Sequence, residues 1–153
     1  MEQITQNPEK STPSPIETLS LDECWVLLES ESFGRLAVAV NGEIEIFPVN
    51  YAAYDGALYV RTAAGTKLAA VTISDRVAFE VDRIAAPGAR SVVVKGRAEV
   101  LETAADIAAA EEAGLRPWVA STKSRHIRIR PTEVTGRSLR FGPEPEVEPD
   151  VTC

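Results

Sequence analysis

Apolar and polar residues alternate over several stretches of the chain, which is the pattern of β-strands that bury one face. The clearest stretch is 76–82, where Val77, Phe79 and Val81 share one face and polar or small residues occupy the other. Comparable strands are predicted over residues 33–40, 43–50, 58–61, 91–100 and 125–130. The last of these is expected to stop at Pro131, with residues 134–137 extending it after a bulge.

Short turn signals separate most of these strands. Asn41-Gly42 lies between two alternating runs, and both central residues of a type I′ turn need positive φ angles, which Asn and Gly tolerate well. Asp55-Gly56 gives a second turn, and Pro87-Gly88 marks a loop between the strands over 76–82 and 91–100. Connections this short favour antiparallel hairpins over parallel strands with crossover helices.

Helical signals are few and short. Ser20 and Glu23 form the sequence pattern of a capping box, and the following helix has Leu21, Cys24, Trp25 and Leu28 on its apolar face. A second helix is predicted over 104–113, closing at Gly114. A third is expected to begin at Thr66 and to continue through residue 71.

Six hairpin-type strands with short helices predict a mainly β fold, a six-stranded antiparallel barrel. Closure of the barrel leaves no exposed sheet edge. Pro48 lies inside a predicted strand although it has no N–H to donate. We therefore expect an edge, a bulge or a ligand close to the backbone at this residue.

Composition predicts one globular domain over residues 18–141 of the 153, between a flexible leader (1–17) and an acidic tail (142–153). The net charge of −7 lies mostly outside this domain, because the leader carries −2 and the tail −4. A nearly neutral domain with acidic ends argues against nucleic-acid binding. No apolar run is long enough to span a membrane and no signal peptide is recognisable, so a cytoplasmic protein is expected.

The stretch 58–68 reads as an anion cradle, in which a strand ends in a small-residue turn and a helix begins. The first amides of a helix have no partners within it and lie at its positive end, so a phosphate there meets both donors and a favourable dipole. Arg61 and Lys67 flank the turn. The alternative is that Gly65, Thr66 and Lys67 serve only capping and solubility. A P-loop and a GxGxxG motif are both absent from the sequence.

Other candidate residues are isolated. His126 is the single histidine and no spacing suggests metal ligands around it, so a surface or interface imidazole is expected. Trp25 is predicted to lie in the core, whereas Trp118 follows Pro117 in a non-periodic segment, which suggests stacking on a ring or burial at a dimer contact. Neither cysteine indicates a disulfide or a metal cluster.

Eight short segments follow one another in an order and spacing that match a known family. They are Leu19–Cys24, Phe33–Ala37, Pro48–Tyr51, Tyr54–Gly56, Val60–Lys67, Val77–Asp82, Ser91–Ala98 and Arg128–Pro131. With them the chain resembles the pyridoxamine 5′-phosphate oxidase-like, FMN-binding split-barrel superfamily, especially its nitroimidazole-resistance-like branch. The resemblance implies a six-stranded split barrel that forms a homodimer with two flavin sites at the subunit interface.

The resemblance also assigns residues to the flavin site. It places the strand around Val49 and Asn50 along the isoalloxazine edge, with backbone groups serving the pyrimidine end of the ring. It assigns the phosphate to Arg61, Thr62, Thr66 and Lys67, in agreement with the anion cradle, and it implies a further contact from the partner subunit through Trp118 or Arg128.

The sequence departs from the better-known members of this superfamily. Arg61 stands where nitroimidazole-resistance proteins tend to carry His, and Arg128–Pro131 only loosely matches the C-terminal motif of true pyridoxamine-phosphate oxidases. We therefore expect neither drug reduction nor vitamin B6 oxidation. The leading expectation is an FMN-dependent oxidoreductase that reduces a small electrophile.

Three alternatives stay open. The first is a non-catalytic flavin- or haem-binding module that acts as a redox sensor or carrier. The second is a reductase that uses the deazaflavin F420, and the third is an interaction domain without a cofactor. One Lys and one Arg at the cradle suit a single phosphate, which favours FMN.

Overall fold

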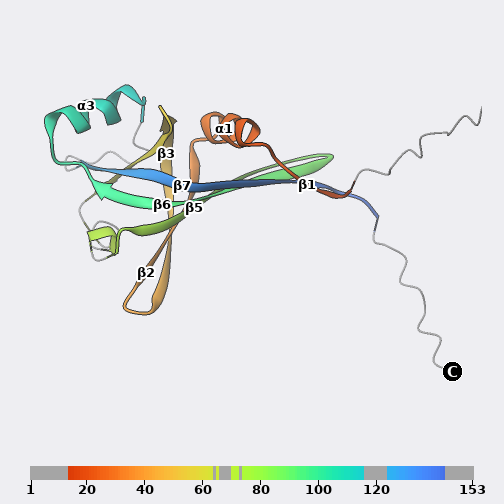
Figure 1. The fold of residues 1–153 in the computed structure, drawn as a ribbon, viewed down its shortest axis with the longest axis horizontal. Coiled ribbons are helices and arrows are strands. Elements are labelled where there is room, and N and C mark those ends of the chain that lie inside the picture. The colour runs from red at the N-terminus through yellow and green to blue at the C-terminus, as the bar shows by residue number, and fades with distance from the viewer. Residues whose placement is uncertain (1–13, 64, 66–69, 73, 116–123, 144–153) are drawn as a thin grey trace, which may run out of the picture.

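The protein, represented by a computed structural model, is described over residues 14–63, 65, 70–72, 74–115 and 124–143. Its elements in chain order are β1 (Ile16–Thr18), α1 (Leu21–Ser30), β2 (Phe33–Val40), β3 (Glu43–Tyr54), β4 (Ala57–Ala63), β5 (Arg76–Ala85), β6 (Gly88–Val100), α3 (Ala104–Glu112) and β7 (Ser124–Arg140). Residues 70–72 are helical. Figure 1 labels these elements except β4.

Six of the strands close into a barrel. The order in the sheet is β1-β7-β4-β3-β2-β5-β6, every pair is antiparallel, and β6 also pairs with β7. That last pairing joins the two ends of the β2–β7 set, which confirms the predicted six-stranded barrel. The seventh strand, β1, lies outside the ring on β7. Ile16 and Glu17, which the sequence analysis assigned to the leader, therefore belong to the sheet.

Both predicted glycine turns are present. Val40 pairs with Glu43 across Asn41 and Gly42, whose φ angles are 50° and 80°. Tyr54 pairs with Ala57 across the Asp55-Gly56 turn, which has φ angles of 49° and 74°. These positive values are the ones that a type I′ hairpin turn requires.

One strand prediction was wrong at Pro131, because β7 runs through it to Arg140 without a break. Gly96 pairs with Pro131 and Lys95 pairs with Glu133, so Thr132 is an extra residue in β7. A bulge of this kind lets a strand pass a residue that cannot donate to the ladder. The predicted bulge before residues 134–137 is thus confirmed, but it does not end the strand.

The core fills the barrel with the inward residues of each strand. Phe79, Leu36, Leu58 and Ile127 are fully buried, and the inward side chains Val77, Phe79 and Val81 of β5 are buried as predicted. Tyr51 packs edge-on against Phe79 with ring centroids 4.6 Å apart. These contacts make the barrel interior a packed core.

Helix α1 closes over this core. Its capping box is present, with the Glu23 amide donating to Ser20 Oγ at 3.2 Å and the Ser20 amide donating to Glu23 Oε1 at 3.1 Å. Its buried residues are Cys24, Leu27 and Leu28, whereas Leu21 is 59% exposed, so the predicted apolar face was one turn too long. A Cβ on Gly136 would lie 2.6 Å from the Cys24 sulfur, so α1 approaches the β7 backbone closely.

Helix α3 covers a different face, the outer side of β4 and β7. Thr103 caps its N-terminus, because the Thr103 side chain accepts a hydrogen bond from the Asp106 amide at 3.1 Å. Tyr59 of β4 and Ala110 of α3 lie in a small apolar cluster under the helix, with Ala57 and Leu101. The first half of β4 therefore lies between the barrel core on one side and α3 on the other.

Candidate functional site

Successive residues at the end of β4 face opposite sides of the sheet. Leu58 and Val60 point into the barrel core and Tyr59 points toward α3. Thr62 follows the inward series and is only 8% exposed, whereas Arg61 follows Tyr59 and is half-buried. Arg61 and Thr62 therefore lie on opposite faces of the strand, although the resemblance assigns both to the phosphate.

Arg61 lies opposite His126 on β7. Burial lowers the pKa of His126, the positive charge of Arg61 lowers it further, and Glu111 of α3 acts in the opposite direction. These two strands and the helix thus bring a guanidinium, an imidazole and a carboxylate together on the outer side of the barrel. The His126 imidazole, which was expected at the surface or at an interface, is half-buried.

Thr62 lies opposite Arg125 on β7. Arg125 is exposed and helps to line a hollow of about 390 Å³ whose other residues include Val71 and Thr72 of the helical stretch 70–72. Ala70 and Val71 are buried, so this stretch packs on the barrel core. A cation, a buried hydroxyl and the helix after the turn thus meet at one end of the barrel.

Sequence reasoning missed Arg125. The signal was the two-residue spacing of Arg125, Ile127 and Ile129, which places all three on the inward side of β7. Ile127 and Ile129 are fully buried, and Arg125 comes at the strand end, where that side opens to solvent. The alternation therefore indicates a cation at the rim of the barrel.

The second part of the predicted site is the strand around Val49 and Asn50. Residues 43–50 of β3 pair with β2, but pairing with β4 covers only residues 51–54. Over the described residues, the other edge of β3 at 43–50 therefore has no strand beside it. Pro48 lies in this part, as expected for a residue that cannot support a ladder on both sides.

Val49 and Asn50 differ in what they expose. The Val49 side chain is 3% exposed and belongs to the barrel core, so only its backbone is available to a ligand. Asn50 is half-buried and faces outward, opposite Phe33 of β2. This arrangement suits recognition of a ring edge by backbone groups.

Arg128 is held within the chain. Its Nε donates to Glu99 Oε1 at 2.6 Å and its Nη1 to Asp106 Oδ1 at 3.3 Å, while its side chain is 11% exposed. The hydrogen bond from Arg128 holds the pKa of Glu99 below its ordinary range, although burial works against it. In this chain the guanidinium therefore ties α3 to the barrel, a role that the sequence did not indicate.

Three other predicted contacts, Thr66, Lys67 and Trp118, lie outside the described residues. The predicted cap and the cationic end of the cradle thus stay predictions. Gly65, directly before Thr66, has no heavy atom of the described chain within 4 Å of the position that a Cβ would take.

A separate ion cluster lies on the outer face of β2 and β5. Arg35 donates from Nη2 to Asp82 Oδ2 at 2.8 Å, and its Nε lies 3.0 Å from Glu80 Oε2. Burial and the nearby Asp82 raise the pKa of Glu80, and Arg35 opposes this. The three groups satisfy one another, so we assign the cluster to stability.

The described ranges hold neither a cluster of metal-binding side chains nor a helix of membrane-spanning length. No group of three or more His, Cys, Asp or Glu residues is close enough there to hold a metal ion. None of the described helices is long and apolar enough to cross a bilayer.

Comparison with known proteins adds sequence and fold relatives. The profile of the pyridoxamine 5′-phosphate oxidase family matches residues 20–138. An uncharacterized protein of Mycobacterium tuberculosis is 45% identical over 93 residues, which cover 61% of this chain and 84% of that protein. The profile match spans α1, α3, the strands β2 to β6 and most of β7.

Solved structures agree with the sequence matches. A candidate pyridoxamine 5′-phosphate oxidase from Corynebacterium glutamicum is 36% identical and superposes with a TM-score of 0.76, covering 86% of this chain and 99% of that one. An FAD-binding protein from Mycobacterium smegmatis is 40% identical with a TM-score of 0.73, covering 82% and 100%. A nitroimidazole-resistance candidate from Bacteroides thetaiotaomicron, 12% identical with a TM-score of 0.66 and covering 84% of this chain and 92% of that one, shares the fold alone.

Proposed function

The chain belongs to the pyridoxamine 5′-phosphate oxidase family of split-barrel proteins, and from this membership we propose that it is a flavin-binding protein. The observation that carries the proposal is the FAD-binding relative that is 40% identical over its whole length. We propose FMN as the cofactor, with FAD as the second candidate that this relative favours. A haem-binding protein from Mycobacterium smegmatis, which is 18% identical with a TM-score of 0.63, supports only a common fold.

The described residues fit such a cofactor. A flavin mononucleotide needs donors for one phosphate and backbone groups along the edge of its ring. Buried Thr62 and the rim cation Arg125 lie together beside the helix after the turn, where Thr66 and Lys67 are expected to complete the phosphate site. No described strand pairs with the edge of β3 beside Val49, so backbone groups there could meet the edge of the ring.

We propose that the reaction is reduction of a small electrophile. A bound flavin supplies hydride and electron transfer, so the protein needs no catalytic triad. The chain itself would hold the phosphate at the end of β4, orient the ring along β3 and shape the substrate cavity. Arg61 is half-buried beside His126 and Glu111, and would place a positive charge near the phosphate end from the outer side of the barrel.

We also propose a homodimer and a cytoplasmic location. Ile44 and Ile46 are 74% and 64% exposed on the outer face of β3, next to its unpaired edge. Exposed aliphatic side chains beside an open strand are typical of a surface that a partner covers. The free, buried thiol of Cys24 is in keeping with a reducing compartment.

Purification without added cofactor, followed by separate titration with FMN, FAD, F420 and haem, tests the binding proposal. The expected result is a visible flavin spectrum that saturates with one flavin per chain. Failure of all four cofactors to bind would overturn the proposal. The remaining alternative would then be an interaction domain without a cofactor. Steady oxidation of reduced nicotinamide with a nitro or quinone acceptor would support the enzyme, and tight binding without turnover would support a redox module.

A further inference from the structure

Three arginines face one another across the outer side of the barrel. Arg76 of β5 lies directly opposite Arg97 of β6, and Arg97 lies directly opposite Arg130 of β7. All three alternate with buried residues and are exposed. Like charges directly opposite on neighbouring strands are destabilising. This arginine row therefore needs compensating negative charge.

The chain supplies only part of that charge. Asp75 Oδ2 accepts from Arg97 at 2.8 Å, and Glu99 Oε1 accepts from Arg130 Nε at 2.9 Å. The Arg76 side chain has no hydrogen bond or ion pair with any described residue, although its backbone lies in the ladder with β6. The Nζ of nearby Lys95 lies 3.9 Å from Glu133 Oε2, which is long for an ion pair. Both side chains are more than half exposed, so this pair is weak. The Arg76 end of the row is left with excess positive charge.

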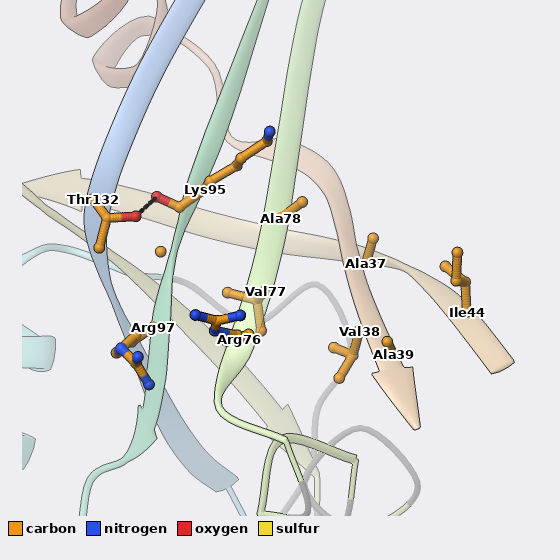
Figure 2. Close-up of a pocket in the computed structure, with 11 residues that line it drawn as sticks. Ala37, Val38, Ala39, Ile44, Arg76, Val77, Ala78, Lys95, Arg97 and Thr132 are labelled. Atoms are coloured by element: carbon orange, nitrogen blue, oxygen red, sulfur yellow. Dashed lines mark hydrogen bonds between the residues drawn. The ribbon is translucent and has the colours of Figure 1, made fainter. Parts of the chain in front are cut away.

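A hollow of about 470 Å³ lies beside this charge. Its apolar lining includes Ala37 and Ala39 of β2, Ala78 of β5 and Ile44 of β3, together with Val38 and Val77. In Figure 2, Ala37, Ala39 and Ile44 lie at the right, Ala78 and Arg76 come from β5 in the middle, and Arg97 and Thr132 lie at the left. Thr132, the extra residue of the β7 bulge, donates its hydroxyl to the Lys95 carbonyl at 3.1 Å.

The size and chemistry of the hollow select its ligand. Its volume lies in the range of small-molecule sites. The methyl groups of three alanines leave a shallow apolar floor that a planar ring can cover. Arginine forks bind phosphate oxygens through paired hydrogen bonds, which suits Arg76 and Arg97 at the other end.

We propose that this hollow is a second ligand site, which binds a nucleotide-type organic phosphate. The phosphate lies at Arg76 and Arg97, and the flat ring lies on Ala37, Ala39 and Ala78. The site is separate from the end of β4, because none of its lining residues belongs to β4. It does not depend on the flavin proposal.

Calorimetric titration of the full-length protein with ADP tests this site. We expect ADP to bind, and Arg76→Ala to weaken it by at least about tenfold, the loss expected for a charge-assisted phosphate contact. Arg137→Ala is the matched control, because it removes an exposed arginine from β7 outside the hollow and should leave the affinity unchanged. Lys67→Ala should also leave it unchanged.

Two partial ligands separate the ends of the hollow. Inorganic pyrophosphate should bind more weakly to Arg76→Ala than to the wild type, and equally well to Ala78→Leu. Adenosine should bind more weakly to Ala78→Leu, whose larger side chain fills the apolar floor, and equally well to Arg76→Ala. Absence of ADP binding to the wild type, or equal losses in Arg76→Ala and Arg137→Ala, would overturn the proposal. Loss of ADP binding in Lys67→Ala alone would place the nucleotide at the end of β4 and would also overturn it. Retention of flavin, measured on the same samples, reports independently on the proposed function.

Discussion

At the residue scale, the candidate site depends on the alternation of a single strand. Thr62 continues the buried face of β4 and meets Arg125, whereas Arg61 continues the other face and meets His126 and Glu111. A phosphate at the barrel end would meet the first pair directly. Arg61, His126 and Glu111 lie on the opposite side of the sheet, where their main effect on a ligand is electrostatic.

Alternation could have assigned these faces from the sequence, because Leu58 and Val60 already mark the inward side. The resemblance named Arg61 and Thr62 together because they are adjacent in its motif. The role of Arg128 was not predictable in the same way. Its partners Glu99 and Asp106 come from different elements, and only the packing of α3 on the barrel brings them within reach.

The lowered pKa of His126 makes stability depend on pH. The folded state holds the imidazole proton less tightly than the unfolded state, whose pKa is near the ordinary 6.5. The unfolded state therefore binds more protons as the pH falls. The stabilising contribution is fully present above pH 6.5 and is lost as the pH drops through the folded pKa.

We expect urea unfolding of the wild type to show a fall in the free energy of unfolding between about pH 7.5 and 5 that is smaller in His126→Gln. Glu111→Gln removes the carboxylate that raises the His126 pKa, so it should make this fall larger. The same pH slope in wild type and His126→Gln would show that the histidine is not perturbed.

At the element scale, α3 is attached through one nearly buried guanidinium. Arg128 contacts both Glu99 of β6 and Asp106 of α3, whereas Arg130 contacts only Glu99 and is 65% exposed. Arg128 is nearly buried, whereas Glu99 and Asp106 are 45% and 37% exposed, so removing the guanidinium leaves two partly solvated carboxylates without compensation. Exposed ion pairs contribute little.

Arg128→Ala should therefore lower the free energy of unfolding by about 2 to 3 kcal/mol, while Arg130→Ala should lower it by less than about 1 kcal/mol. Chemical denaturation measures both values, and amide hydrogen exchange in residues 104–112 shows whether α3 opens first. Equal effects of the two substitutions would mean that Arg128 does not anchor the helix.

The elements themselves were largely predictable, with failures that have local causes. The glycine turns and the capping box depend on neighbouring residues, so the sequence was sufficient for them. Pro131 was taken as a stop because the propensity rule ignores the partner strand, and the bulge at Thr132 removes the conflict. Leu21 fits the helical period of α1, but at the first turn that face extends beyond the barrel surface to solvent.

At the scale of the whole molecule, closure between β6 and β7 removes most sheet edges, but one edge of β3 at residues 43–49 has no neighbouring strand among the described residues. The barrel class followed from counting hairpins. The position of this open edge did not, because it depends on how far β4 extends along β3. Pro48 was the single sequence feature that pointed to it.

If a second copy covers this edge, a charge in the apolar patch should separate the subunits. We expect Ile46→Asp to convert a dimer to a monomer in sedimentation velocity, because it buries a carboxylate without a partner. Ile84→Asp, at an isoleucine that is 72% exposed near the end of β5, is the matched control and should leave the dimer intact. A monomeric wild type, or a dimer that persists in Ile46→Asp, would exclude this face as the interface.

The most direct test of the account is whether Lys67 recognises the flavin phosphate. We would compare the affinities of FMN and riboflavin, which lacks the phosphate, in wild type, Lys67→Ala and the leader control Lys10→Ala. We expect wild type and Lys10→Ala to bind FMN at least about tenfold more tightly than riboflavin. Lys67→Ala should lose most of this preference. An unchanged preference in Lys67→Ala, or equal affinity of the wild type for both flavins, would contradict a phosphate site at the end of β4.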